Sequence, residues 1–349
     1  MRPSCLAHAR LRHLLAAALI FAPGLGLALL PAGPAGAAQR IKITTPVASL
    51  TATSLYLAKA RGLFSEEGLD VEIVVTGGTG PDVKAMLAGD AEFAYTPGNM
   101  IFVMYQQGQP TLGLMAGLSR CIINWAIHRD VALAKGITEE TPLEQKLRAL
   151  QGLTVGPTLS GALTWHLAEY VVRRAGYVPQ KDVRIIPAGS GPAMLAALEH
   201  RKVDIILMST PIPETAVHRG MALMFLNNAK GEDPALPEFM MVDLLTRPDT
   251  VRKSPDLVRR ATRAFVRANR WAVEHTPEEV REALRAQFPR IDAQVLLAGI
   301  QTVKSAIPAD GRITERSVQV TQDVLEQAGL LKTRVPYSAV INNDFLPRP

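Results

Sequence analysis

Residues 69–95 read LDVEIVVTGGTGPDVKAMLAGDAEFAY and contain three structural elements in close succession. A run rich in β-branched residues at 71–76 leads into a glycine-rich turn at 77–80. A helix-forming run follows at 81–88, and a second β-rich run occupies 91–95. Strand, helix and strand at this spacing predict a βαβ unit, because a crossover helix brings the second strand back parallel to the first.

The same alternation continues on both sides of this stretch. Upstream, the pattern predicts a strand at 41–45 and a helix at 52–61. Downstream, a turn at 96–99 leads into a helix that reaches Gln107, and a strand follows at 111–116. This order predicts a mostly parallel sheet that is covered by helices on both faces.

A second block of the same kind follows. An extended stretch at 121–128 precedes a polar, acidic interval at 135–144, which we interpret as a boundary between two lobes. The strands expected after it lie at 153–156, 183–187, 204–208 and 221–226, and the expected helices lie at 161–174, 191–200 and 213–219. Two blocks of similar size predict two α/β lobes, since one domain typically holds about 100–200 residues.

Beyond a strand at 239–244 the chain is mostly helical. Ser254 followed by proline, and Thr276 with a glutamate three residues later, are typical of helix starts. Four arginines fall largely on one side of the first of these helices, and we interpret that side as a solvated face: Arg259, Arg263, Arg267 and Arg270. Because these helices have no strand block of their own, we expect them to pack against the first lobe.

The N-terminal segment has the pattern of a secretory signal peptide. Arginines at positions 2, 10 and 12 precede an apolar run at 14–30, and Ala35-Gly36-Ala37 supplies small residues for cleavage. We therefore expect residues 1–37 to be removed and the mature protein to be periplasmic. An uncleaved membrane anchor is the alternative, which the prolines and glycines of the segment disfavour. Lipidation is not indicated, because Cys5 precedes the apolar run.

Charge and cysteine content exclude several classes of protein. Removing the leader takes away three arginines and no acid, which lowers the formal net charge from +6 to +3. No basic face with interleaved aromatic residues is evident, so a nucleic-acid partner is not expected. Cys121 is the one mature cysteine, which excludes an intrachain disulfide and a cysteine-rich metal site. We expect a monomer without a cofactor.

Nucleotide-binding and hydrolase motifs are missing. Gly78-Thr79-Gly80 is followed by Val83 where a dinucleotide fingerprint requires its last glycine. Ser160 lies outside a nucleophile motif and has no recognisable acid and base in order.

A metal site is not predicted either. His166 and Glu169 are three residues apart on a predicted helix and could share a metal ion, but a third ligand is missing. We favour a packing or surface role for this pair, because polar pairs at this spacing are common on helices.

Ligands of open parallel sheets bind beyond the carboxyl ends of the strands, where loops gather and helices begin. In this chain that rule selects the loops 45–51, 77–80, 96–99, 158–161, 188–191 and 209–213. They are rich in Thr, Ser, Gly and Asn, whose hydroxyls, amides and exposed N–H groups could hold an anion at helix N-termini. The alternative is that these residues only form turns and caps. Trp125 and Trp165 are candidate apolar walls, although Trp165 could equally be buried in a lobe core.

Two stretches resemble a known family. Residues 56–72, YLAKARGLFSEEGLDVE, and residues 86–95, MLAGDAEFAY, are similar to the sulfonate, nitrate and taurine type of ABC-importer substrate-binding proteins and their thiamine-pyrimidine-precursor relatives. Weaker similarity resumes near 196–204 and extends to 342–346, so that it covers nearly all of the mature chain.

The resemblance implies a type II periplasmic-binding fold, in which two α/β lobes close on a ligand. It places the crossings between the lobes near 121–129 and 227–244. The expected division is 1–37 for the signal peptide, 38–127 for the first part of lobe 1, 128–236 for lobe 2 and 237–349 for the return to lobe 1.

Carried onto this sequence, the resemblance also implies a set of ligand-binding residues. They are Ala48, Ser49, Thr51, Gly78, Thr79, Gly80, Thr96, Pro97, Gly98, Asn99, Asn124, Ser160, Gly161, Ser209, Thr210 and Asn227. No arginine lies in these loops, which weakens the assignment of an anionic ligand without removing it.

The implied function is the capture of a small organic solute, either an anion of the sulfonate or carboxylate kind or a pyrimidine precursor, for delivery to an ABC permease in the inner membrane. A periplasmic sensor that reports to a receptor is the first alternative. An enzyme resembling thiamine-pyrimidine synthases is the second, and the lack of a cysteine-rich iron motif argues against it.

Overall fold

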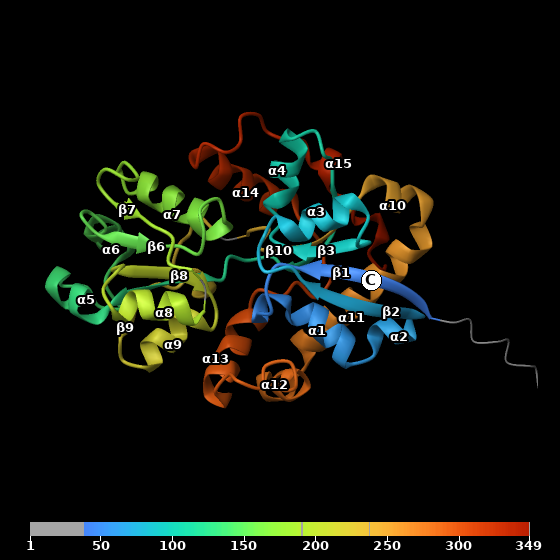
Figure 1. Cartoon of the computed structure of the whole chain (residues 1–349), viewed down its shortest axis with the longest axis horizontal. Helices are drawn as coiled ribbons and strands as arrows, with labels where there is room; N and C mark the ends of the chain where they lie inside the picture. The colour runs from blue at the N-terminus through green and yellow to red at the C-terminus, as the bar shows by residue number, and fades with distance from the viewer. Residues whose placement is uncertain (1–37, 190, 237, 349) are drawn as a thin grey trace, which may run out of the picture. The chain divides into compact units, whose positions relative to one another are not determined.

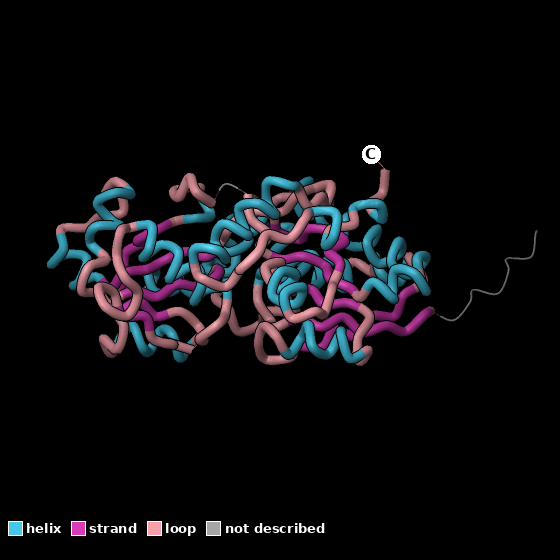
Figure 2. Tube along the Cα trace, turned by 90° about the horizontal axis from the view of Figure 1, so that it is seen from above, coloured by secondary structure: helices cyan, strands magenta, loops and turns pink. Residues whose placement is uncertain are grey.

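The computed structural model describes residues 38–189, 191–236 and 238–348, so the predicted signal peptide at 1–37 lies outside the described residues. The described chain forms two five-stranded sheets flanked by helices (Figure 1). Seen from above, the two sheets lie side by side with loops between them (Figure 2). This arrangement confirms the predicted two-sheet α/β fold.

The first sheet contains four parallel strands and one antiparallel strand. Its order is β2 (Leu69–Val75), β1 (Gln39–Thr45), β3 (Phe93–Thr96), β10 (Val242–Thr246) and β4 (Leu112–Leu118). Strand β1 pairs in parallel with β2 and β3, whereas β10 runs antiparallel between β3 and β4. The sheet is therefore completed by a strand from much later in the chain.

Helices cover both faces of this sheet. The early helices are α1 (Thr53–Ala60), α2 (Leu63–Glu66), α3 (Pro81–Ala88) and α4 (Met100–Gln106), and a 3₁₀ turn at Leu50–Ala52 precedes α1. The late helices are α10 (Pro248–Lys253), α11 (Pro255–Glu274), α12 (Pro277–Leu284), α13 (Ala293–Lys304), α14 (Glu315–Gln327) and α15 (Tyr337–Val340), followed by a 3₁₀ turn at Asn343–Phe345. Helices α3 and α4 lie on one face and α1 and α11 on the other (Figure 1).

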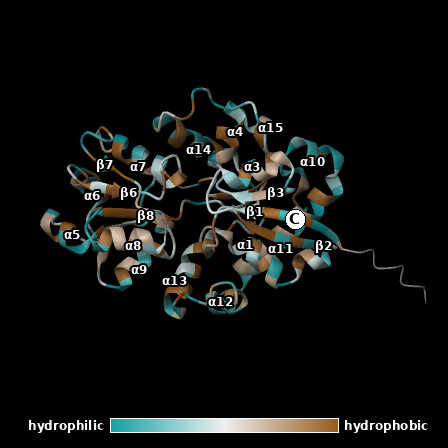
Figure 3. Ribbon diagram, in the orientation of Figure 1, coloured by the Kyte–Doolittle hydropathy of each residue, from teal (hydrophilic) through white to brown (hydrophobic). Residues whose placement is uncertain are grey.

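The second sheet repeats the plan of the first. Its order is β7 (Arg184–Ile185), β6 (Thr154–Gly156), β8 (Ile205–Ser209), β5 (Ile123–His128) and β9 (Ala222–Leu226). Its helices are α5 (Arg129–Lys135), α6 (Leu143–Ala149), α7 (Leu163–Arg174), α8 (Pro192–Glu199) and α9 (Ile212–His218). Strand β5 runs antiparallel to β8 and β9. Hydrophobic residues gather along the strands, as the brown colour of β8 shows in Figure 3.

Two crossings connect the sheets and run beside each other. The chain leaves the first sheet after β4 and returns to it at β10. The N–H of Phe239 donates to the carbonyl of Ser119 at 2.9 Å, and the N–H of Met241 donates to Leu118 at 3.2 Å. Ion pairs hold the returning segment to the second sheet's layer, with Lys146 on Glu232 at 2.5 Å and Arg174 on Asp233 at 2.7 Å.

Two details of the predicted division differ from the structure. Strand β5 pairs in the second sheet, whereas the predicted boundary at residue 127 assigned most of it to the first lobe. The polar interval 135–144 joins α5 to α6 and does not separate the lobes. Both differences arise because strand pairing between residues about 80 positions apart leaves no local signal in the sequence. The predicted boundary after residue 236 falls within the returning crossing.

The arginine-rich side of α11 is partly exposed, with the side chains of Arg263 and Arg267 43% and 40% exposed, and it also contacts α2. Arg263 donates to Glu67 at 2.7 Å and Arg267 donates to Glu66 at 2.5 Å, which attaches α11 to the end of α2. Arg259 lies over the ring of Phe345. The sequence did not indicate these ion pairs, because the acidic partners are about 200 residues away along the chain.

The predicted capping box at the start of α12 is confirmed. The Thr276 hydroxyl accepts from the N–H of Glu279, whose carboxylate accepts from the N–H of Thr276. Among the residues described, no helix combines the length and the apolar character that crossing a membrane would require.

Candidate functional site

The loops that follow the parallel strands of both sheets enclose a cavity of about 240 Å³. Loops after β1, β2 and β3 line it from the first sheet, and loops after β6, β7 and β8 line it from the second. This is the position that the sheet topology favours for a ligand, because carboxyl ends of strands and starts of helices meet there. We call this cavity the first chamber.

No residue that lines the first chamber carries a charged side chain. Its polar atoms are hydroxyls and backbone groups, and the hydroxyl-bearing residues are Thr45, Thr51, Thr79, Tyr95, Thr158, Ser160, Thr164 and Ser209. Its apolar wall consists of Pro46, Val47, Pro97, Ile123, Leu159, Ala162, Leu163, Met208, Met241 and Val242. Such a lining suits an apolar body that carries a few polar groups. Leu159 is 56% exposed at this wall, so a ligand or a closing movement would remove apolar surface from water.

A second chamber of about 490 Å³ adjoins the first and shares Val47, Met208 and Ser209 with it. Its remaining residues are Ala48, Ser49, Leu50, Gly191, Pro192, Leu195, Thr210, Pro211, Ile212, Thr215, His218, Arg219, Arg290, Ile291, Asp292 and Val295. The start of α13 thus forms a wall of this chamber opposite α8 and α9.

Helix α13 comes very close to the second sheet's layer at Gly299. A Cβ atom at this glycine would lie 3.0 Å from the hydroxyl oxygen of Thr210 and 2.6 Å from a methyl group of Leu50. A larger residue at 299 would press against Leu50 and Thr210, so glycine favours the present approach of α13 to the Thr210–Pro211 turn. The two layers therefore already touch beside the second chamber.

The structure brings ten of the sixteen predicted ligand-binding residues to the chambers. Thr51, Gly78, Thr79, Pro97, Ser160, Gly161 and Ser209 line the first chamber, and Ala48, Ser49, Thr210 and again Ser209 line the second. Gly80, Thr96, Gly98, Asn99, Asn124 and Asn227 line neither. Ligand contact stays a prediction for all of them.

Several of the six residues have partners within the protein. The amide nitrogen of Asn124 donates to Glu214 at 2.8 Å, and its amide oxygen accepts from the N–H of Ala229 at 3.2 Å. The Asn227 side chain caps a 3₁₀ turn at Asn228–Lys230. Thr96 is fully buried in β3. The sequence pattern could not distinguish these structural amides and hydroxyls from cleft residues.

The tryptophans do not form the walls of the site. Trp125 is fully buried in β5, and Trp165 packs against the core of the second sheet's layer. Aliphatic residues and methionines take that place, and Met208 and Met241 lie where a strand end and the returning crossing meet the cavity. Sequence analysis missed Tyr95, Met241 and Val242 because it considered loops only.

A buried carboxyl lies behind the loop that carries Pro97. Asp243 in β10 is fully buried, and neither of its carboxyl oxygens has a hydrogen-bond partner among the described residues. Burial raises the pKa of Asp243 well above its usual value. One of its oxygens would lie 1.9 Å from a Cβ at Gly98, which explains why glycine occupies that position.

Replacing Asp243 with asparagine should make stability less dependent on pH. Because the folded-state pKa is raised, the wild-type protein is most stable below the unfolded-state pKa and loses stability as the pH rises toward the folded-state pKa. Asparagine does not titrate, so the variant avoids this loss. In urea unfolding, the free energy of unfolding of the variant relative to wild type should rise from about pH 4 upward, by up to about 1.4 kcal/mol per pH unit. The exposed Asp70→Asn serves as control, and parallel pH curves for wild type and Asp243→Asn would contradict the assignment.

No metal site accompanies the chambers among the described residues. On α7, the Nδ1 atom of His166 lies 3.9 Å from a carboxylate oxygen of Glu169. The Nε2 atom of His166 contacts the carbonyl oxygen of Gly161 at 2.8 Å. Burial lowers the pKa of His166. His166 therefore supports the loop at Gly161, which lines the first chamber.

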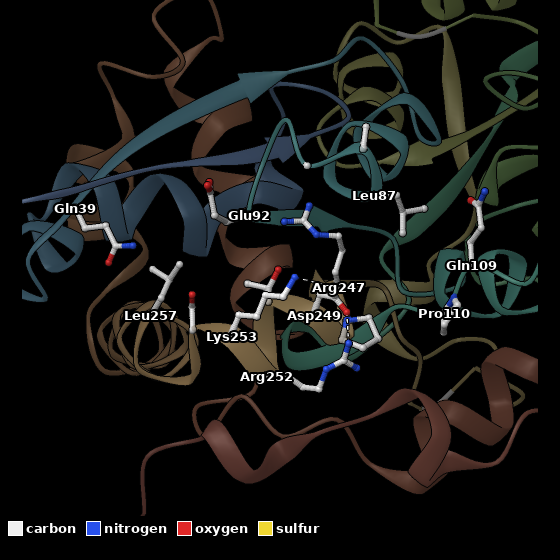
Figure 4. A pocket seen from close by; sticks show the side chains of 15 residues that line it. Gln39, Leu87, Glu92, Gln109, Pro110, Arg247, Asp249, Arg252, Lys253 and Leu257 are labelled. Atoms are coloured by element: carbon white, nitrogen blue, oxygen red, sulfur yellow. Dashed lines mark hydrogen bonds and ion pairs between the residues drawn. The ribbon is translucent and has the colours of Figure 1, made fainter.

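A wider hollow of about 830 Å³ lies at the opposite end of the first sheet, between the start of β1 and the start of α10 (Figure 4). Its charged groups already have partners. Arg247 donates to the carbonyl of Ala91 at 3.0 Å, Glu92 accepts from the N–H of Lys42, and Asp249 pairs with Arg252 and Lys253. The hollow receives loops from one sheet only, so we do not assign the binding site to it.

Two α/β units whose loops enclose an uncharged cavity form the periplasmic binding protein fold. Within this class the chain belongs to the NMT1/THI5-like family, whose model matches residues 50–280. The putative binding protein YtlA of Bacillus subtilis is 20% identical over 311 residues, which are 88% of this chain and 88% of YtlA.

Solved structures of binding proteins share the fold. The ligand-binding component of an ABC-type import system from Staphylococcus aureus, with zinc bound, has a TM-score of 0.69 and 15% identity, covering 88% of this chain and 97% of that one. The alkanesulfonate-binding protein SsuA from Xanthomonas axonopodis pv. citri, bound to MOPS, has a TM-score of 0.65 and 16% identity, covering 86% and 97%. All three relatives are named as binding proteins.

Proposed function

We propose that this chain is the extracytoplasmic solute-binding component of an ABC importer. It captures a small organic solute, an anion of the carboxylate or sulfonate kind or a pyrimidine precursor, and delivers it to a membrane permease. The observation that carries this proposal is the convergence of loops from both sheets on one uncharged cavity lined by hydroxyls and apolar side chains. The similar structures of a ligand-binding component of an ABC-type import system and of an alkanesulfonate-binding protein support it.

The geometry suits capture better than catalysis. A ligand in the first chamber would contact both sheets' layers at once and would favour the conformation in which these layers are close. The contact of Gly299 with the Thr210–Pro211 turn is of the kind that such a closed form requires. No bond is formed or broken, and the hydroxyls would satisfy the polar groups of the solute as it loses water.

The predicted leader at 1–37 supports export of the protein to the periplasm, where a permease would receive the closed form. A sensor that reports the same solute to a receptor is the alternative. Reconstitution with the permease in vesicles distinguishes the two, because only an importer component drives uptake of the solute.

A thermal-shift screen of the purified chain 38–349 should identify the solute. The panel contains sulfonates, taurine, nitrate, aromatic and aliphatic carboxylates, and pyrimidine precursors. A ligand at 100 times its dissociation constant should stabilise the folded protein by about 2.7 kcal/mol and raise the melting temperature accordingly. A flat response from protein that is folded and stripped of bound solute would count against this solute class.

A further inference from the structure

The two chambers differ in charge, and this difference is informative about the solute. The first chamber has no charged lining residue, whereas the second has Arg219, Arg290 and His218 at its walls. At about 240 Å³ the first chamber is smaller than the roughly 300–1,000 Å³ typical of small-molecule sites. Because Val47, Met208 and Ser209 line both chambers, a ligand that extends past these residues would occupy both.

The cationic side chains of the second chamber are available to a ligand. Neither Arg219 nor Arg290 forms an ion pair with any residue in the described part of the chain. Both are exposed, and they come from opposite walls, one from the end of α9 and the other from the loop before α13. A group held between them would therefore contact both layers.

The one acidic residue of the second chamber is already used by the protein. A carboxylate oxygen of Asp292 accepts from the N–H groups of Gln294 at 2.8 Å and Val295 at 3.2 Å, which caps α13. These bonds lower the pKa of Asp292 and fix its position. Its charge thus stabilises the helix start, and Arg219 and Arg290 are the arginines in the lining of this chamber.

Thr210 and the start of α8 complete the wall of the second chamber. Thr210 is 1% exposed, and its hydroxyl packs against α13 at Gly299. The chamber also receives the start of α8 at Gly191, where no side chain caps the helix. The positive end of α8 favours an anionic group.

We propose that the solute-binding site has two compartments, and that its solute is an elongated organic anion with its apolar or aromatic body in the first chamber and its carboxylate or sulfonate in the second, near Arg219 and Arg290. This inference rests on the proposed function and specifies its solute. It explains how a cleft whose central loops contain no arginine accepts an anion. It also assigns a binding role to α13, which the sequence did not indicate.

A matched pair of fluorescent dyes tests the proposal. 8-Anilinonaphthalene-1-sulfonate carries an aromatic body and a sulfonate, and N-phenyl-1-naphthylamine has the same body without the sulfonate. We expect Arg219→Gln combined with Arg290→Gln to raise the dissociation constant of the sulfonate dye about tenfold or more, while that of the neutral dye changes less than about twofold.

The control variant replaces two other exposed arginines, so its net charge changes by the same amount as in the Arg219/Arg290 variant. Arg184 and Arg316 line neither chamber, so the double variant Arg184→Gln with Arg316→Gln should leave both dyes unaffected. The two-compartment proposal is overturned if folded wild-type protein does not bind the sulfonate dye. It is also overturned if both dyes weaken alike, or if the control variant weakens the sulfonate dye as much.

The outcome is separable from that of the solute screen. A solute that stabilises wild type and the Arg219/Arg290 variant equally would support solute capture and overturn the second compartment. If no solute and no dye binds, both the capture of this solute class and the two-compartment site are contradicted.

Discussion

Replacing Arg174 with leucine should lower the free energy of unfolding by about 3–5 kcal/mol, because it leaves a buried carboxylate without its partner. Arg174 donates to both oxygens of Asp233 at 2.7 Å, and the Asp233 side chain is 1% exposed. Burial alone would lower the pKa of Arg174, but the bonds with Asp233 raise it above its usual value. Urea unfolding at neutral pH measures the loss.

The neighbouring residue provides the control for this variant. Arg173 is exposed on the same turn of α7 and forms no ion pair with the described residues, so Arg173→Leu should change the free energy of unfolding by less than about 0.5 kcal/mol. Leucine at both 174 and 233 should recover part of the loss, since no charge is then buried alone. Equal effects of the two single variants would contradict a dominant role of the pair.

Replacing Gly78 with tryptophan should abolish solute binding and leave the fold intact. Gly78 lines the first chamber, its backbone is not in the left-handed region, and an added Cβ meets no atom within 4 Å. The indole would therefore enter the space that the solute needs. We expect the dissociation constant of any solute found by the screen to rise about 100-fold or more, which corresponds to at least about 2.7 kcal/mol.

Gly78→Ala is the matched control, because it makes the same backbone change without filling the chamber. It should bind the solute within about threefold of wild type, as isothermal titration calorimetry would show. Both variants should unfold at the wild-type urea concentration. Normal solute affinity in the tryptophan variant would exclude the first chamber as the binding site.

Much of the fold could be predicted from local patterns. The helix expected at 81–88 is α3, and the capping box of Thr276 and Glu279 begins α12 as expected. The rule that ligands bind beyond strand ends selected the loops that line the first chamber, because it depends only on the order of strands and helices.

Partners that are distant in the chain could not be predicted. Asn124 and Glu214 are 90 residues apart, and Arg263 and Glu67 are 196 apart, so no local pattern shows that these side chains are used inside the protein. The same holds for α13, whose contribution to the second chamber follows from its packing against Thr210 and not from a motif. The residue types indicated hydroxyl, amide and backbone groups as the ligand contacts. Only the tertiary structure showed which of these residues line the cleft.

The position of β10 in the first sheet affects the order in which the two sheets can form. The pairing of β10 with both β3 and β4 means that this sheet has no link between these strands until residues 242–246 have been synthesised. The five strands of the second sheet are all contained within 123–226. A chain that emerges from its N-terminus can thus complete its second sheet before its first. Strands β1, β2 and β3 can pair early, but β4 joins them only through the later β10.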